Sequence, residues 1–371
     1  MERFRRITSQ QSSSFRPATA IPNRPQHRWR VNDLSILAGL HRAYFGEEVE
    51  HTAQLKGDGS ARTLWRLQSR SVSAIGVHGP DRAENRAFIG FSRTFLDCGL
   101  PVPEIYAVSE DESHYLEEDL GDMTLYDVIR SDHTSTDDLL AYYRDAVRWL
   151  VRFQTEGGRE IDYSLCYQTR EFGEEAVRKD IAYFRTMFIE QLWQGPFDSR
   201  SFERDMETLL ERLLAANREY FLYRDFQSRN IMVQGSRLRF IDYQSGRKGA
   251  LYYDLASLLY DAKARLTPTF REDIIAAYLT ELERYLPVER AWFMNEFYPY
   301  VLIRIMQALG AYGNLGYRQR KPGFLSSIPP AMENLAHLAQ STDAFDGLPY
   351  FLELCTLLSQ SQRLRTLDEL S

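Results

Sequence analysis

The sequence has few cysteines and no long apolar run. Its 371 residues include 3 cysteines, Cys98, Cys166 and Cys355, which are odd in number and far apart. This pattern excludes a disulfide framework and a CxxC metal site, and it favours reduced thiols in a cytosolic protein. No uninterrupted apolar stretch approaches the ~18 residues of a membrane-spanning helix. The sequence therefore predicts a cytoplasmic protein without a membrane partner.

The first 30 residues lack the apolar segment of a secretory signal. They contain seven arginines and one glutamate, together with many serines. A disordered basic tail is the simplest interpretation of residues 1–30, although the composition also resembles that of an organelle transit peptide. The full sequence has a net charge of -7, which argues against nucleic acid as a partner.

Residues 31–120 are rich in predicted strands. Apolar residues at helical spacing predict a first helix over 34–45, with Asn32 or Asp33 as its N-cap. A second helix is expected at 81–97. Strands are expected at 51–56, 63–68, 71–77, 104–109 and 114–118.

Beyond Gly121 the apolar pattern becomes helical. Apart from a short hairpin within 231–241, the segments of residues 121–371 with helical spacing are 136–157, 172–188, 202–217, 268–285, 288–313, 328–340 and 350–363. The length of the chain also suggests about two domains. The sequence therefore predicts an α+β fold with a small β-rich lobe and a larger helical lobe, separated by a cleft in which a ligand can bind.

Residues 220–261 carry the strongest chemical pattern. Asp225 and Asn230 lie five apart on a polar segment, a predicted hairpin follows, and Asp242 stands at its end. Phosphoryl transfer needs a carboxylate that accepts the proton of the attacking hydroxyl and oxygen ligands that hold Mg²⁺ on the nucleotide phosphates. A loop beside a hairpin can bring these three side chains to one point. The ordered set therefore predicts a phosphoryl-transfer site.

A glycine-rich turn joins the first two predicted strands. It contains Gly57, Gly59 and Ser60. Glycine lets backbone N–H groups approach phosphate oxygens, because no Cβ holds the backbone away from the anion. The same residues also make an ordinary hairpin turn, so their role depends on the rest of the chain.

Several segments resemble the aminoglycoside phosphotransferase and choline kinase group of small-molecule kinases. In that group HxDxxxxN is followed by DFxxxxxGxxxxDLA, and residues 223–230 and 242–256 are similar to these motifs. The likeness extends from about residue 30 to about residue 340. Within the group the chain most resembles bacterial anomeric kinases of N-acetylmuramate and N-acetylglucosamine. The segments that carry this closer likeness are 60–67, 102–122, 241–259 and 321–335.

The resemblance implies a bilobal protein-kinase-like fold that uses ATP and Mg²⁺. Residues 31–120 would bind the nucleotide, and residues 121–371 would supply catalysis and bind the acceptor. Asp225 would be the general base, with Asn230 and Asp242 as the metal ligands. The acceptor implied is a sugar hydroxyl, with the anomeric hydroxyl of an N-acetylhexosamine first. Aminoglycosides, choline and homoserine are the alternatives.

The nucleotide is expected to lie between the glycine turn and the segment that joins the lobes. Backbone atoms around Glu117 and Asp119 would contact adenine. The family normally supplies a phosphate-binding lysine on the third strand, but residues 71–77 contain none. Arg62 is the favoured substitute, ahead of Arg66. Its acidic partner would be Glu84, with Glu47 as the alternative.

Other polar residues carry weaker expectations. The family's histidine is replaced by Tyr223, which we expect to fill the same structural role. Asp254 is expected to cap a helix or to brace the catalytic loop, whereas Gln244 suits either a substrate contact or packing. Arg224 and Arg229 are expected to be structural or solvated, with neutralising phosphate or fixing neighbouring acids as the alternative. The residues that suit the lining of a sugar site are Tyr312, Tyr317, Arg318 and Arg320.

The histidines show no metal-ligand spacing. His41, His51, His78 and His114 are each expected to be packed or at the surface. A hypothesis from another class also remains. The missing lysine and histidine would fit a nucleotide-binding pseudokinase, although such a protein needs no general base. The sequence does not indicate the oligomeric state.

Overall fold

The structure is a computed structural model that describes residues 26–55 and 61–367, and for residues 26–31 it describes the backbone alone. Within these residues five strands form one antiparallel sheet in the order β1-β2-β3-β5-β4. The strands are β1 (His51–Gln54), β2 (Thr63–Gln68), β3 (Ser73–His78), β4 (Ile105–Val108) and β5 (His114–Glu118). Most of the basic tail expected at 1–30, and the turn residues Gly57, Gly59 and Ser60, lie outside the described residues.

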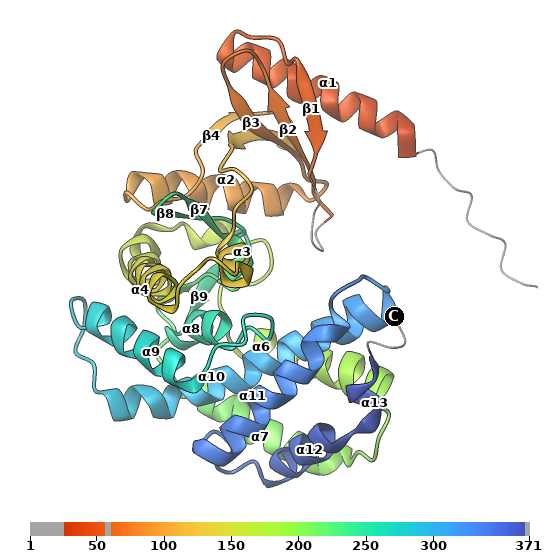
Figure 1. The fold of residues 1–371 in the computed structure, drawn as a ribbon, viewed down its shortest axis with the longest axis vertical. Coiled ribbons are helices and arrows are strands. Elements are labelled where there is room, and N and C mark those ends of the chain that lie inside the picture. The colour runs from red at the N-terminus through yellow and green to blue at the C-terminus, as the bar shows by residue number, and fades with distance from the viewer. Residues whose placement is uncertain (1–25, 56–60, 368–371) are drawn as a thin grey trace, which may run out of the picture.

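A helix covers each face of this sheet (Figure 1). Side chains alternate along a strand, so Trp65 and Leu67 of β2 point to one face and pack against Leu37 of α1 (Gln26–Phe45). The other face packs against α2 (Arg82–Asp97), where the rings of Phe88 and Tyr115 lie 5.6 Å apart. The two faces therefore have different roles: one holds α1, and the other faces the helical lobe.

Helix α2 connects the two lobes. It begins at Asp81, whose side chain accepts hydrogen bonds from two backbone N–H groups of the first turn, as an N-cap does. Its apolar side packs against the helical lobe. The ring centres of Phe88 and Tyr243 stack 4.9 Å apart, and the Phe95 ring meets the Phe221 ring edge-on at 5.1 Å. Both partners belong to the segment that carries the predicted catalytic residues. The position of α2 relative to that segment is thus set by buried aromatic packing.

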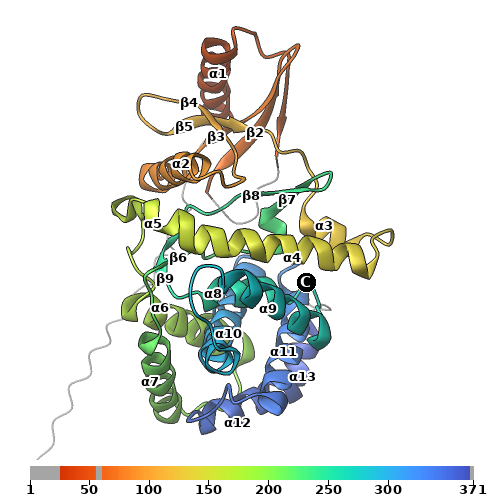
Figure 2. The same cartoon turned by 90° about the vertical axis from the view of Figure 1, so that its left-hand side faces the viewer.

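The helical lobe follows a short connector (Figure 2). The connector passes through Gly121, where φ is 84°, a conformation that favours glycine. The helices are α3 (Leu125–Arg130), α4 (Thr136–Arg152), α5 (Gly158–Glu160), α6 (Glu174–Phe184), α7 (Ser199–Ala215), α8 (Tyr252–Leu259), α9 (Pro268–Leu282), α10 (Arg290–Ala311), α11 (Ile328–Ser341), α12 (Pro349–Gln360) and α13 (Gln362–Arg365). Among the described residues, no helix combines the length and the apolar character needed to cross a membrane.

Two short antiparallel ribbons enclose the predicted catalytic segment. Strand β6 (Tyr220–Leu222) pairs with β9 (Arg247–Gly249), and β7 (Ile231–Gln234) pairs with β8 (Arg237–Phe240). The loop between β6 and β7 carries Asp225 and Asn230. The loop between β8 and β9 carries Asp242. Each of the two loops therefore has a paired strand at both of its ends.

The expected fold class is confirmed, with differences in detail. Helix α1 begins at Gln26, so Asn32 and Asp33 lie inside it and the predicted N-cap was wrong. The ribbon of β6 and β9 was not predicted, because strands of three residues are too short to show alternation. Helix α3 has six residues, fewer than two turns, so its apolar pattern gave no signal.

Candidate active site

Asp254 braces the loop that carries Asp225. Its Oδ2 accepts a hydrogen bond from the backbone N–H of Tyr223 at 2.7 Å, and its Oδ1 accepts one from that of Arg224 at 2.9 Å. Arg224 has a φ of 82°, which is unfavourable for a residue other than glycine, and these bonds hold it there. The helix cap expected of Asp254 was wrong, since Leu251 has the N-cap position of α8, whereas the loop brace is present.

The Asp225 carboxylate is left open to a ligand. In the part of the sequence that the structure describes, no group donates a hydrogen bond to it. Its backbone carbonyl instead accepts from Asn230 Nδ2 at 2.8 Å and from the Gln227 N–H at 2.9 Å, which fixes the direction of the loop. Burial, and then the charge of Asp242, raise the pKa of Asp225. A raised pKa makes this carboxylate a better proton acceptor for catalysis near neutral pH.

A pocket of the helical lobe lies in front of Asp225. Its charged lining residues besides Asp225 are Arg229, Asp261, Lys263 and Arg304. Of the four residues expected to line a sugar site, Tyr312 lines this pocket. The structure places Tyr317, Arg318 and Arg320 in a different pocket, beside Lys321.

Asp242 receives hydrogen bonds on both carboxylate oxygens. Oδ1 accepts from Arg62 Nη2 at 2.8 Å and from Gln244 Nε2 at 2.8 Å, and Oδ2 accepts from Asn230 Nδ2 at 3.2 Å. Asp242 has a φ of 70°, so its backbone is also in the left-handed region. Strained backbone of this kind is common where a side chain must be aimed at a ligand.

Tyr223 supports the backbone segment that carries Asp242. Its side chain is fully buried, and its hydroxyl donates to the backbone carbonyl of Ile241 at 2.6 Å. That carbonyl belongs to the residue immediately before Asp242. A tyrosine thus packs and hydrogen-bonds under the segment that carries Asp242, which is the role expected for the residue that replaces the family's histidine.

Arg62 crosses from the sheet to the helical lobe. Besides its bond to Asp242, its Nε lies 3.6 Å from Glu84 Oε1. The side chains of Arg62 and Glu84 are 12% and 16% exposed, so water screens this pair less than a surface pair. Burial raises the pKa of Glu84, while Arg62 opposes the rise. Gln244 Nε2 also reaches Glu84 Oε1 at 3.4 Å, which assigns Gln244 to the support of these acids.

The two alternative residues of the small lobe have other partners. Arg66 makes a bidentate contact with Asp119, through Nε at 2.7 Å and Nη2 at 2.9 Å. Glu47 accepts hydrogen bonds from Ser69 and Ser71, which lower its pKa to about 2. Neither side chain joins the cluster around Asp242, so Arg62 and Glu84 are the pair that the structure brings to it.

The segment between the lobes contributes two acidic side chains. Asp119 accepts from Arg66, from Ser73 Oγ at 2.5 Å and from the Gly121 N–H at 3.0 Å, so its carboxylate fixes the connector to the sheet. Glu117 has a buried Oε2 with no hydrogen-bond partner among the residues described. Burial raises the pKa of Glu117 to about 8, with Arg62 opposing and Asp242 adding to the rise.

The side chain of Glu117 was missed at the sequence level. Only backbone contacts were expected there. Strand alternation offered a signal, because Glu117 lies two residues after Tyr115 and therefore faces α2 and the cleft as Tyr115 does. The adenine contact of this segment remains a prediction.

The two flanking arginines differ. Arg224 is locked in place: its Nη2 donates to Asp180 Oδ1 at 2.8 Å, and its guanidinium lies 4.8 Å from the centre of the Tyr253 ring. Arg229 is exposed and lines the pocket in front of Asp225. Only the second is placed to meet a ligand.

The oxygen donors of the site suit a hard cation such as Mg²⁺. Asn230 Nδ2 donates to the Asp225 carbonyl and to Asp242, which leaves the amide Oδ1 without a donor among the described residues. That oxygen and the Asp242 carboxylate are the ligand types that Mg²⁺ prefers. Asn230 and Asp242 are thus the residues that would hold the ion.

Comparison with known proteins defines the class. The family described as the phosphotransferase enzyme family matches residues 51–290, which is more than half of the chain. The chain therefore belongs to the phosphotransferase enzyme family. It is a small-molecule kinase with a bilobal protein-kinase-like fold.

The individual relatives have low sequence identity to this chain. The N-acetylmuramate/N-acetylglucosamine kinase of Neisseria meningitidis serogroup B is 28% identical over 249 residues, which are 64% of this chain and 71% of that protein. The protein of the same name from Pseudomonas aeruginosa is 22% identical over 298 residues, or 73% of this chain and 79% of its own. A solved spectinomycin phosphotransferase in complex with ADP and spectinomycin has a TM-score of 0.55 at 12% identity, covering 88% of this chain and 98% of that one. At that identity the likeness shows the fold alone.

Proposed function

We propose that this enzyme transfers the γ-phosphate of ATP to the anomeric hydroxyl of an N-acetylhexosamine, in a reaction that requires Mg²⁺. N-acetylmuramate and N-acetylglucosamine are the leading acceptors. The observation that carries the proposal is the open Asp225 carboxylate facing a pocket that three basic side chains line. The names of the two relatives support the choice of sugar. Because the reaction uses ATP, we place it in the cytoplasm.

The charge of the pocket supports an acidic or neutral acceptor. Arg229, Lys263 and Arg304 line it together with Asp225 and Asp261, so three basic side chains face two acidic ones. N-acetylmuramate carries a carboxylate that such cations would attract. Aminoglycosides and choline carry positive charge and would be repelled. The pocket therefore favours a muramate-type sugar over the cationic alternatives.

In the proposed reaction Asp225 accepts the proton of the acceptor hydroxyl. The hydroxyl oxygen forms a bond to the γ-phosphorus, the bond from that phosphorus to the oxygen shared with the β-phosphate breaks, and ADP leaves. Arg62 would hold the phosphate oxygens from the small-lobe side. Mg²⁺, held by Asn230 and Asp242, would neutralise the charge on the phosphates. Asp254 and Tyr223 keep Asp225 and Asp242 aimed at one point.

An acceptor panel tests the reaction. Purified protein would be incubated with Mg²⁺-ATP and N-acetylmuramate, N-acetylglucosamine, an aminoglycoside, choline or homoserine, and ADP release and the phosphorylated product would be measured. Asp225→Asn should lower kcat by about 10²- to 10⁴-fold while ATP still binds, since it removes the base alone. Asp261→Asn, the same change in the same pocket, should alter kcat only a few-fold. Transfer to no acceptor, with ATP bound, would instead support the pseudokinase hypothesis.

A lysine substitution tests the choice of sugar. Lys263→Gln should lower kcat/KM for N-acetylmuramate by about ten-fold, because a partly buried charge-assisted contact is lost. For N-acetylglucosamine, which has no carboxylate, the change should be much smaller. Lys321→Gln, in the other pocket, is the control. Equal losses for both sugars with Lys263→Gln would contradict the assignment of the carboxylate to this side of the pocket.

A further inference from the structure

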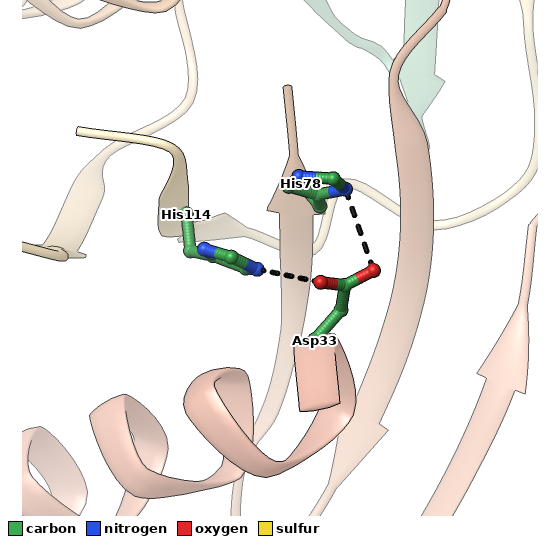
Figure 3. Close-up of side chains that lie close together, drawn as sticks. All are labelled: Asp33, His78 and His114. Atoms are coloured by element: carbon green, nitrogen blue, oxygen red, sulfur yellow. Dashed lines mark hydrogen bonds and ion pairs between the residues drawn. The ribbon is translucent and has the colours of Figure 1, made fainter. Parts of the chain in front are cut away.

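Three chemistry-bearing side chains meet on the face of the small-lobe sheet that lies away from the catalytic cleft. His78 ends β3 and His114 begins β5, and the two are direct partners in the antiparallel register. Asp33 reaches them from α1, which covers that face (Figure 3). The two histidines are packed, as the sequence predicted, but their meeting with Asp33 was not foreseen. No spacing rule could reveal it, because the sheet and α1 bring together residues that are far apart in sequence.

The distances suit a small cation. Asp33 Oδ1 lies 3.2 Å from His114 Nε2, and Asp33 Oδ2 lies 3.4 Å from His78 Nδ1. All three candidate ligand atoms lie within 4.8 Å of one another. With metal–ligand bonds near 2.0–2.1 Å, two ligands of a tetrahedral zinc ion lie roughly 3.4 Å apart. The two measured distances are close to that value but run to different oxygens of Asp33, so binding through one oxygen requires the His78 ring to turn toward it.

The hydrogen bonds around His114 favour a cation at this point. Ser113 Oγ donates to Asp111 Oδ1 at 2.7 Å, and hydrogen bonds from Ser113 and Ser109 lower the pKa of Asp111, which keeps it ionised. Because the only hydroxyl hydrogen of Ser113 is used in this way, its oxygen accepts from His114 Nδ1–H at 2.8 Å. Neutral His114 then presents the lone pair of Nε2 to the Asp33 carboxylate. Two acceptors at 3.2 Å repel unless a proton or a metal ion lies between them.

The surroundings of His114 suit a metal ligand. The bond from Nδ1–H to Ser113 is the outer-shell contact that usually orients a metal-binding histidine. The His114 side chain is 5% exposed and fixed, whereas that of His78 is 28% exposed. The His78 ring, now stacked on His114 at 4.6 Å, can therefore turn about its Cβ–Cγ bond to complete the site.

We propose that Asp33, His78 and His114 bind a divalent transition-metal ion of the zinc type, with water as the fourth ligand. Imidazole nitrogen with one carboxylate is a donor set that suits Zn²⁺ and not Mg²⁺. The site lies on α1 and on two central strands, so a bound ion would fasten α1 to the sheet. It is separate from the Mg²⁺ ligands, which lie on the helical lobe.

Zinc titration of full-length, tag-free protein tests the proposal. The titration would be carried out in excess Mg²⁺ with a chromophoric chelator as competitor. The wild type should bind one Zn²⁺ with a Kd of about 1 μM or below, and Co²⁺ in its place should give the visible absorption of a four-coordinate site. Binding should raise the melting temperature, because the ion binds only the folded lobe.

Variants localise the ion. His78→Gln and Asp33→Asn should each weaken zinc binding by at least about ten-fold, as loss of one of three protein ligands requires. His51→Gln on the exposed strand β1 and Asp242→Asn in the catalytic cleft should bind zinc as the wild type does. The proposal is overturned if the wild type binds no zinc, in which case a proton bridges Asp33 and His114. It is also overturned if both ligand variants keep wild-type affinity. His78 is partly exposed, so its variant is expected to fold.

Discussion

Replacement of Tyr223 by phenylalanine separates the support of the site from its chemistry. The Tyr223 ring packs edge-on against Phe153 at 5.6 Å, Phe226 at 5.2 Å and Tyr243 at 5.8 Å, and phenylalanine keeps all three contacts. The change removes one atom, the hydroxyl oxygen that donates to the Ile241 carbonyl at 2.6 Å. Tyr223 is fully buried, so its hydroxyl position is not open to solvent in the wild type.

The cost follows from that single bond. Leaving a buried carbonyl without its donor costs about 1–3 kcal/mol of folding free energy. The packing contribution is close to zero, since the ring stays. The effect on catalysis should be larger than this loss of stability suggests. Ile241 immediately precedes Asp242, whose φ of 70° is strained. Loss of the hydrogen bond to the Ile241 carbonyl therefore lets the Asp242 side chain shift from its position in the site. A misplacement of roughly 1 Å at a reacting centre costs about 10²-fold in rate.

A second Tyr→Phe variant serves as the matched control. Tyr300 is also buried, and its hydroxyl donates to the backbone carbonyl of Leu213 at 2.8 Å, between α10 and α7, where neither residue lines the pocket in front of Asp225. Urea unfolding would give the stability of both Tyr→Phe variants. Their kcat would be measured as a function of Mg²⁺ concentration. We expect similar losses of stability and a fall in kcat or in apparent Mg²⁺ affinity for Tyr223→Phe alone. Unchanged turnover in Tyr223→Phe would refute the argument that this hydroxyl positions Asp242.

Two further predictions concern the cleft. Because the folded protein keeps a proton on Glu117 up to a pKa of about 8, against 4.5 in the unfolded chain, its free energy of unfolding should fall as pH rises between these values. Glu117→Gln should remove on the order of 3 kcal/mol of that fall in urea unfolding at pH 5 and 8, and an unchanged pH slope would show that Glu117 is not the buried acid. Arg62→Ala should lower kcat/KM for ATP by about 10²-fold, because it leaves Glu84 and Asp242 as unpaired like charges and removes the phosphate contact. Arg82→Ala, at the exposed start of α2, should stay within about two-fold, and unaltered ATP kinetics in Arg62→Ala would exclude Arg62 from phosphate binding.

The catalytic loop could be predicted from the sequence because its parts are contiguous. Asp225 and Asn230 lie on one loop, and their mutual geometry is set by local hydrogen bonds such as that from Asn230 Nδ2 to the Asp225 carbonyl. The lobes could be predicted for a related reason: strand alternation and helical spacing are local patterns. Residues whose roles depend on near neighbours in the sequence were therefore the accessible ones.

The rest of the site depends on contacts between distant segments. Arg62 and Asp242 are separated by 180 positions in the sequence, and only the resemblance suggested that they share one site. Nothing local indicated that Lys263 and Arg304 line one pocket with Asp225, or that Gln244 joins Glu84 to Asp242. Such contacts are set by helix packing, which a single sequence does not specify.

The two arginines of the cleft face of the small lobe show why one of them suits phosphate binding. They are four residues apart and share a face of the sheet, yet Arg66 is bound bidentately to Asp119 of the connector. A bidentate pair of this kind is geometrically fixed, and it holds the connector to the sheet. Arg62 instead reaches Asp242 across the cleft through one nitrogen, Nη2, at 2.8 Å. An incoming phosphate can compete for Arg62, and in doing so it frees a carboxylate oxygen of Asp242 as a metal ligand. We therefore expect nucleotide and Mg²⁺ to exchange with the Arg62–Asp242 contact, and to bind more tightly together than either does alone.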